Sequence, residues 1–269
     1  MIDIGANLSN RQFDNDIEEV IIRAKDNNIS SLILTSVDLD TYFKNINIIN
    51  SYQHILPIYN TYGLHPHNAN NWQEVFNDIQ NHLQHPSIKA IGEFGLDYFR
   101  MISPQNIQTK VMEMFLDEAK NFPHLPLFLH ERESFDDFYH ILKSSHVSNK
   151  SVVHCFTGNK DQLKAYIDLG CFIGITGWIS DNRRNADIVE ALKYLPLDRL
   201  MIETDCPYLT PKNLTKKYIR NEPAYLNYIN KSIAQLLNKS EEEVKQIGIQ
   251  NTLDFFSIPE YNISNKIKI

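Results

Sequence analysis

Short runs of apolar residues alternate along the whole chain with stretches in which apolar residues recur every three or four positions. A strand buried on both faces gives the first pattern, and an amphipathic helix gives the second. The apolar runs predict eight strands, at residues 2–8, 31–35, 55–62, 89–92, 126–129, 151–153, 171–175 and 200–203. The periodic stretches predict helices at residues 14–27, 40–51, 71–82, 105–121, 134–145, 159–169, 185–195, 224–238 and 241–256.

A strand followed by a helix, repeated eight times, predicts a parallel sheet with the helices outside it. Eight such units favour a closed α/β fold, the TIM-type (β/α)8 barrel, over an open doubly wound sheet. The chain also has no Gly-x-Gly-x-x-Gly fingerprint after its first strand and no phosphate-binding loop. Barrels of this size commonly form one domain, so we expect residues 1–269 to form a single barrel domain.

Composition and charge narrow the class of protein. No apolar run approaches the roughly 18 residues of a membrane span, so no membrane partner is expected. The three cysteines show no pairing pattern and residues 1–10 do not resemble a signal peptide, which together predict a cytoplasmic protein; we expect a monomer. The net charge of −7 argues against binding nucleic acid through overall charge. A nucleic-acid substrate stays open if metal ions neutralise its phosphates locally.

Acidic and imidazole side chains follow four of the apolar runs, namely Glu93, His130, His154 and Asp205. Alone, Asp205 would more often cap a helix, and a lone histidine would more often be a satisfied core residue. In a barrel, however, the carboxyl ends of the strands converge on one face, where four such groups would be costly to bury unpaired. Imidazoles and carboxylates are ligands for Mg²⁺, Mn²⁺ or Zn²⁺, so the pattern predicts a site for a divalent cation.

Further polar residues fall on the same predicted rim. His65 and His67 follow the third strand, where they could bind metal, donate to a substrate phosphate, or belong to an ordinary turn. Asp97 could orient a ligand or cap the following segment. Arg220 and Glu222 precede a predicted helix, so they could reach a substrate, or Glu222 could serve only the helix dipole.

Two other groups of residues have both a binding and a structural interpretation. A basic run after Asp205 could grip a nucleic-acid backbone or could be a solvated loop; it consists of Lys212, Lys216, Lys217 and Arg220. Single aromatic residues could stack on a terminal base, although they more often pack in the protein; they are Phe94, Trp178 and Tyr208.

Six short motifs, in chain order, resemble those of a known family. They are residues 63–67 (GLHPH), 91–97 (IGEFGLD), 154–158 (HCFTG), 173–178 (IGITGW), 203–209 (ETDCPYL) and 220–223 (RNEP). With them the chain resembles the TatD family of metal-dependent deoxyribonucleases, within the metallo-dependent hydrolase barrels. The similarity covers nearly the whole chain and is greatest to the bacterial members.

The resemblance implies hydrolysis of phosphodiester bonds in DNA with Mg²⁺ or Mn²⁺, and Zn²⁺ as an alternative cation. It further implies a 3′-to-5′ exonuclease on single-stranded DNA, with RNA as an open second substrate and DNA repair as the setting. Position by position, Glu93, His130 and His154 match the family's metal ligands. Asp205 matches the acidic residue that binds metal or activates water, and His65 matches a residue close to the site.

The first strand departs from the wider family. Many members carry Asp-x-His-x-His there, whereas this chain has Asp3, Gly5 and Asn7. This argues against a metal pair held as in those members, and leaves Asn7 as a weak carbonyl ligand or a holder of water. Glu203 is expected to support the strand end rather than the chemistry. Two alternatives stay open: a metal-dependent hydrolase of a small amide, ester or aminoacyl-tRNA, and a binding protein without activity.

Overall fold

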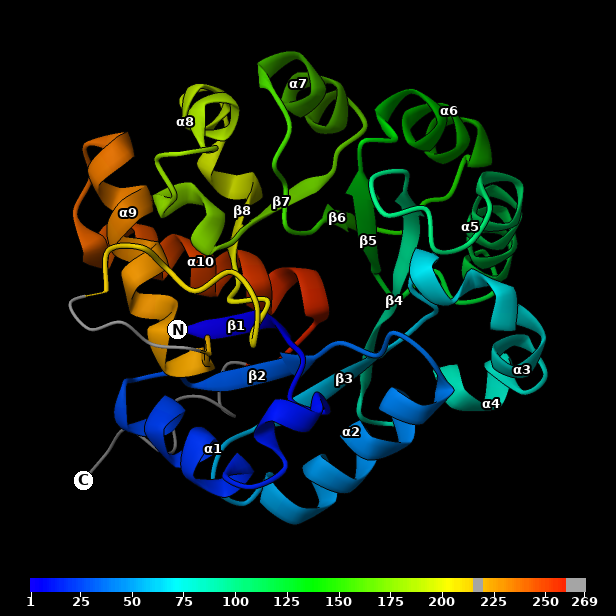
Figure 1. Cartoon of the computed structure of the whole chain (residues 1–269), viewed down its shortest axis with the longest axis horizontal. Helices are drawn as coiled ribbons and strands as arrows, with labels where there is room; N and C mark the ends of the chain where they lie inside the picture. The colour runs from blue at the N-terminus through cyan, green and yellow to red at the C-terminus, as the bar shows by residue number, and fades with distance from the viewer. Residues whose placement is uncertain (215–219, 260–269) are drawn as a thin grey trace.

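Eight parallel strands, joined by helices, run through the computed structural model, which describes residues 1–214 and 220–259. The strands are β1 (Ile2–Ala6), β2 (Ser31–Leu34), β3 (Ile58–Tyr62), β4 (Ile88–Asp97), β5 (Leu127–Arg132), β6 (Ser151–Val153), β7 (Phe172–Ile175) and β8 (Leu200–Ile202). They pair in chain order (Figure 1), and a bridge between Ala6 and Cys206 joins the end of β1 to the segment after β8. The predicted TIM-type (β/α)8 barrel is therefore confirmed.

The helices surround the strands, except that α10 (Glu241–Phe256) lies across one end of the barrel (Figure 1). They are α1 (Ile17–Asp26), α2 (Leu39–Tyr52), α3 (Trp72–Phe76), α4 (Ile79–Leu83), α5 (Gln105–Ala119), α6 (Phe135–Ser145), α7 (Lys160–Asp168), α8 (Ala186–Leu192), α9 (Leu226–Leu237) and α10. Among the described residues, none of these helices has the length and apolar character to cross a membrane.

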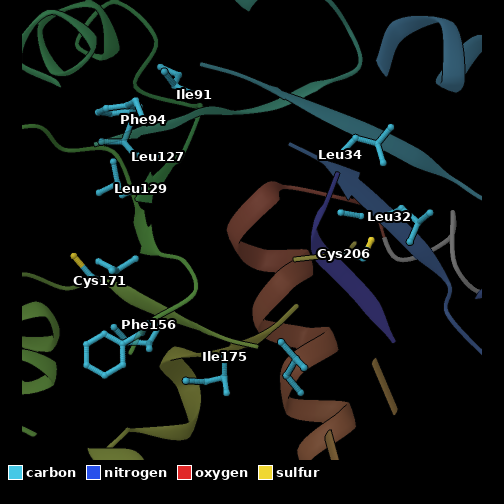
Figure 2. Close-up of a cluster of buried hydrophobic side chains, with 14 of the residues drawn as sticks. Leu32, Leu34, Ile91, Phe94, Leu127, Leu129, Phe156, Cys171, Ile175 and Cys206 are labelled. Carbon is cyan, nitrogen blue, oxygen red and sulfur yellow. The ribbon is translucent and has the colours of Figure 1, made fainter. Parts of the chain in front are cut away.

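The strands alternate between two apolar clusters because successive side chains of a strand point to opposite faces. On β2, Leu32 and Leu34 belong to the large cluster between the sheet and the helices, whereas Ile33 belongs to the cluster inside the barrel. Figure 2 shows part of the outer cluster, including Leu127 and Leu129 of β5. The inner cluster also contains side chains from the end of α10, which therefore packs against the barrel interior.

The same alternation carries polar residues into the barrel above the inner apolar layer. That layer includes Phe128, Val152 and Met201. Two residues further along the same strand directions come His130, His154 and Glu203. The strand period thus predicts that these three polar side chains face the interior at the carboxyl end of the barrel, where this fold places its chemistry.

Two predicted elements were wrong in detail. Residues 71–82 do not form one helix: a 3-10 helix (Pro66–Asn71), α3 and α4 follow one another, with a break at Asp78, whose φ is −138°. Short polar side chains such as those of Asn77 and Asp78 compete for backbone hydrogen bonds and favour such breaks. Glu93 lies within β4 rather than after it, because this strand continues to Asp97. The ends of the other predicted elements shift by only a few residues.

Candidate metal centre

A bulge in β4 aims Glu93 at the mouth of the barrel. The pairing of β4 with β5 shifts register between Gly92 and Phe94, which leaves Glu93 outside the regular ladder. Gly92 has a φ of +144°, and a methyl group there would collide with the carbonyl oxygen of Phe128, so the bulge requires glycine. Bulges commonly re-aim a side chain near an active site. Here the Glu93 backbone N–H turns to the Ser36 carbonyl, at 3.1 Å.

One carboxylate oxygen of Glu93 lies among three imidazoles. Its Oε1 is 2.7 Å from His154 Nε2, 2.8 Å from His130 Nδ1 and 3.4 Å from His65 Nε2, while the His130 and His154 nitrogens are 3.2 Å apart. Two ligands at right angles, each about 2.1 Å from an ion, are about 3 Å apart. Ligand atoms of His65, Glu93 and His130 all lie within 4.8 Å of one another. The donor set and its spacing therefore fit a divalent cation.

The electrostatics of the cluster also suit a cation. Burial alone would raise the pKa of Glu93, but the charge on His154 and the hydrogen bonds of His130 and His154 hold it well below its usual value. Burial would lower the pKa of His154, but Glu93 and Glu203 raise it well above its usual value. His65 behaves oppositely, because burial and the charge on His130 lower its pKa well below normal. Glu93 and Glu203 thus stabilise positive charge at the position of His154, and the neutral imidazole of His65 lies beside it.

Glu203 lies directly behind His154. Its Oε2 is 3.5 Å from His154 Nδ1, and its Oε1 accepts a 2.5 Å hydrogen bond from the Cys155 N–H. Apart from each other, His154 Nδ1 and Glu203 Oε2 have no polar partner in the described part of the chain, and both are buried. A methyl group at Gly5 or Gly174 would collide with this carboxylate, so two glycines leave room for it. The structure thus gives Glu203 a contact with the site that the sequence interpretation did not include.

Asp205 and Asn7 form a second polar pair on the rim. The Asn7 amide donates to Asp205 Oδ1 at 2.9 Å, and the Asn7 carbonyl oxygen accepts from the Thr35 hydroxyl. Both ends of the Asn7 side chain are therefore engaged by the protein. Burial raises the pKa of Asp205 to about 7. A carboxylate whose pKa lies near neutrality suits proton transfer.

The structure brings most of the predicted site residues around one cavity of about 560 Å³. These residues are His65, His67, Glu93, His130, His154 and Asp205. Asp97 reaches two of them, since its Oδ2 lies 2.8 Å from His67 Nε2 and 3.5 Å from His130 Nε2. Its place beside both rings favours the orienting role over simple capping, although its Oδ1 also accepts from the Arg100 N–H.

Arg220 and Glu222 are not brought to this cavity. Arg220 forms a two-pronged ion pair with Asp16, at 2.7 and 2.8 Å, and lies over the Phe13 ring. Glu222 accepts from Arg23 at 2.7 and 2.9 Å. Both residues thus tie the segment before α9 to α1 and its preceding loop. Of the predicted basic run, Lys216 and Lys217 lie outside the described residues.

The predicted aromatic platforms divide into two groups. Phe94 is fully buried and stacks on Phe115 at 4.8 Å, so of its two interpretations the structure supports packing and excludes stacking on a base. Trp178 and Tyr208 line the cavity. Sequence reasoning missed three arginines that also line it, Arg100, Arg132 and Arg184. Their positions in the sequence could have indicated this: Arg100 comes just after β4, Arg132 ends β5 and Arg184 follows β7.

A (β/α)8 barrel with imidazoles and carboxylates gathered at its carboxyl mouth defines a metal-dependent hydrolase. The sequence model of the TatD related DNase family matches residues 2–257, and the chain belongs to that family. It is 35% identical to the "3′-5′ ssDNA/RNA exonuclease TatD" of Edwardsiella piscicida, over 96% of this chain and all of that protein. The family resemblance predicted from the six motifs is confirmed.

Solved structures agree with this placement. A TatD family hydrolase from Entamoeba histolytica superposes with a TM-score of 0.88 at 28% identity, over 95% of this chain and 97% of that chain. A TatD homologue from Escherichia coli k12 superposes with a TM-score of 0.83 over 96% and 98% of the two chains. At 24% identity, the second comparison supports the fold alone. The predicted class of metal-dependent nuclease is thus confirmed at the level of the family.

Proposed function

We propose that this protein is a metal-dependent 3′-to-5′ exonuclease that acts on single-stranded DNA and on RNA. The observation that carries the proposal is the convergence of three imidazoles on one Glu93 oxygen at the base of an open cavity of about 560 Å³. Family membership supplies the reaction class, and the names of the most similar relatives supply the substrate and the direction. A small amide, ester or aminoacyl-tRNA substrate is not favoured by these relatives.

Glu93, His130 and His154 would hold the cation, and His65 Nε2 lies 3.4 Å from the same Glu93 oxygen. A bound divalent cation would lower the pKa of a water molecule and neutralise charge on the phosphate. Mg²⁺ and Mn²⁺ are the cations we propose, because the Glu93 carboxylate lines a cavity of about 560 Å³, which leaves room for ions that keep several of their waters. DNA repair stays a prediction as the setting.

The remaining groups would handle the proton and the phosphate. Asp205 lines the cavity beside the cluster, and its raised pKa of about 7 lets it accept a proton from the attacking water near neutral pH. His67, held by Asp97, is placed to donate to a phosphate oxygen only if its Nε2 exchanges partners, so we assign it a positioning role for the rim. His65, with a neutral ring, can serve as a ligand or as a donor.

The test is degradation of single-stranded oligonucleotides labelled at the 5′ or at the 3′ end, with purified protein and Mn²⁺. A 3′-to-5′ exonuclease shortens the 5′-labelled strand step by step and releases the 3′ label at once. His154→Ala removes a group that contacts Glu93, and we expect it to lose at least about a hundredfold in kcat because the cation is no longer held.

The matched control is His124→Ala, which removes an exposed histidine that precedes β5 and does not line the cavity. It should degrade the strand at the wild-type rate. If His154→Ala remains folded and as active as the control, the activity comes from another site or from a contaminant. Release of the 5′ label first would contradict the proposed direction while leaving the nuclease assignment intact.

A further inference from the structure

Two arginine–aromatic pairs stand at the mouth of the metal-centre cavity. The Arg132 guanidinium, at the end of β5, lies 3.9 Å from the centre of the Phe99 ring, and the Arg184 guanidinium, after β7, lies 3.7 Å from the Trp178 ring. Arg132, Arg184 and Trp178 line the cavity, and Phe99 is 52% exposed beside it. We propose that these two pairs bind one nucleic-acid strand across the mouth, an inference that rests on the proposed function.

No ion pair in the described segments explains the position of the first pair, Arg132 and Phe99. No carboxylate lies within ion-pairing distance of Arg132 or of the neighbouring Arg100 in the described segments. The loop that carries Phe99 also exposes Met101 and Ile102, at 43% and 58%. Large exposed apolar side chains beside unpaired cations are typical of a surface that binds a partner with both bases and phosphates.

The second pair is held rigidly in place. Arg184 contacts Asp181 at 3.1 Å, and the Trp178 indole N–H donates to the Arg184 carbonyl oxygen at 3.0 Å. Arg183 binds the same Asp181 carboxylate, at 2.6 Å. Two cations therefore share one buried anion, which leaves a net positive charge on a fixed platform. Such pre-organisation reduces the entropy that is lost when a ligand binds.

Stacked guanidinium groups can serve both parts of a strand. A guanidinium that lies over a ring keeps its N–H groups in its own plane, where they can donate to two oxygens of a phosphate. The exposed part of the ring is then available to a base, and stacking contributes about 1–3 kcal/mol per base without selecting the base. The pairs therefore supply local attraction for a polyanion on a chain whose net charge is −7.

A neighbouring groove limits where the strand can run. This groove, of about 920 Å³, lies along the start of α6 and α7, and its acidic lining residues are Glu133, Asp136, Asp137 and Asp161. Phosphates are repelled from such a surface. The strand is therefore expected to stay on the arginine-bearing rim, between the loop after β4 and the loop after β7, and to present its end to Glu93.

Binding of a fluorescein-labelled single-stranded oligothymidylate in EDTA, followed by anisotropy, tests the proposal without cleavage. Arg132→Gln and Arg184→Gln should each weaken binding about tenfold, and the double variant about a hundredfold. The slope of log K against log salt should fall by about 0.7 for each lost phosphate contact. Arg132→Lys keeps the charge but not the planar stacking group, so its affinity should lie between wild type and Arg132→Gln.

The matched control is Arg199→Gln, which removes an arginine stacked 5.0 Å from Phe172 at the opposite end of the barrel. It should bind and degrade the strand as wild type does, and thermal unfolding should show all variants folded. Wild-type cleavage with unchanged affinity and salt slope in both glutamine variants would overturn the strand path and leave the nuclease function standing. A wild-type protein that neither binds nor degrades the strand would overturn both.

Discussion

Glu203→Gln is the most specific test of the proposed metal centre. It replaces one buried carboxylate oxygen behind His154 with an NH₂ group and leaves the shape of the side chain intact. In the native protein Glu203 Oε2 faces His154 Nδ1 at 3.5 Å, while Oε1 accepts from the Cys155 N–H. A glutamine would keep its carbonyl oxygen on the Cys155 N–H and turn its NH₂ group to His154. The histidine Nδ1 would then become an acceptor, and the proton would move to Nε2, the nitrogen that faces Glu93.

The size of the effect follows from this geometry. Two full charges 3.5 Å apart interact by about 5 kcal/mol at an effective dielectric constant near 20, which sets an upper limit. A metal-bound imidazole is neutral, so we expect the smaller loss that is typical when the partner of a ligating histidine is removed. That loss is about 10- to 100-fold in metal affinity, or about 1.4–2.7 kcal/mol.

The assay is a titration with Mn²⁺, in which free Mn²⁺ is followed by electron paramagnetic resonance, together with kcat at saturating Mn²⁺. The control is Glu19→Gln, which removes the same charge from an exposed position on α1. The unfolding midpoint of Glu203→Gln should be measured as well, so that weak binding is not confused with loss of fold. If Glu203→Gln binds Mn²⁺ as tightly as Glu19→Gln, the idea that Glu203 orients His154 is refuted.

Three further outcomes are expected. Asn7→Ala removes the donor to Asp205, and since a hydrogen bond to a charged group contributes about 1.5–3 kcal/mol, kcat on single-stranded DNA should fall about 10- to 100-fold; an unchanged kcat would exclude a positioning role. Burial raises the pKa of Asp3 from 3.8 to about 7, so the stability of its protonated form is fully present below pH 3.8 and is lost as pH rises through about 7. Asp3→Asn should therefore lack a decline of about 4 kcal/mol between pH about 4 and 8 in denaturant unfolding, and parallel curves for the two proteins would contradict this. Chelation with EDTA should abolish nuclease activity, and added Mn²⁺ should restore it and raise the thermal midpoint; full activity after exhaustive chelation would argue against a metal centre.

The fold could be predicted because its signals are local. Strands such as β5 and β6 are buried on both faces, so they read as uninterrupted apolar runs that end where His130 and His154 begin. The two-residue period then points both histidines into the barrel. The same period, counted from Met201, would also have pointed Glu203 inward, and this signal was available in the sequence.

Other features depend on contacts that no local pattern encodes. The bulge that turns Glu93 into the mouth arises from how β4 meets β5, and the ion pairs that occupy Arg220 and Glu222 join segments about two hundred residues apart. From the sequence alone, the charged motif at residues 220–223 could line the cavity or lie outside it. Only the packing of α1 against the segment before α9 decides that Arg220 and Glu222 stabilise the rim from outside the cavity.

The ends of β1 and β8 show how this rim is organised without histidines at positions 5 and 7. A side chain at position 5 would occupy the space of the Glu203 carboxylate, and that carboxylate backs His154. At position 7, the asparagine donates to Asp205 while its oxygen is engaged by Thr35. Hydrogen bonds from the chain thus fix the two carboxylates that follow β8. Because the Asn7 amide occupies only Oδ1 of Asp205, this contact holds the carboxylate in place and leaves its second oxygen available to bind a cation or to take a proton from water.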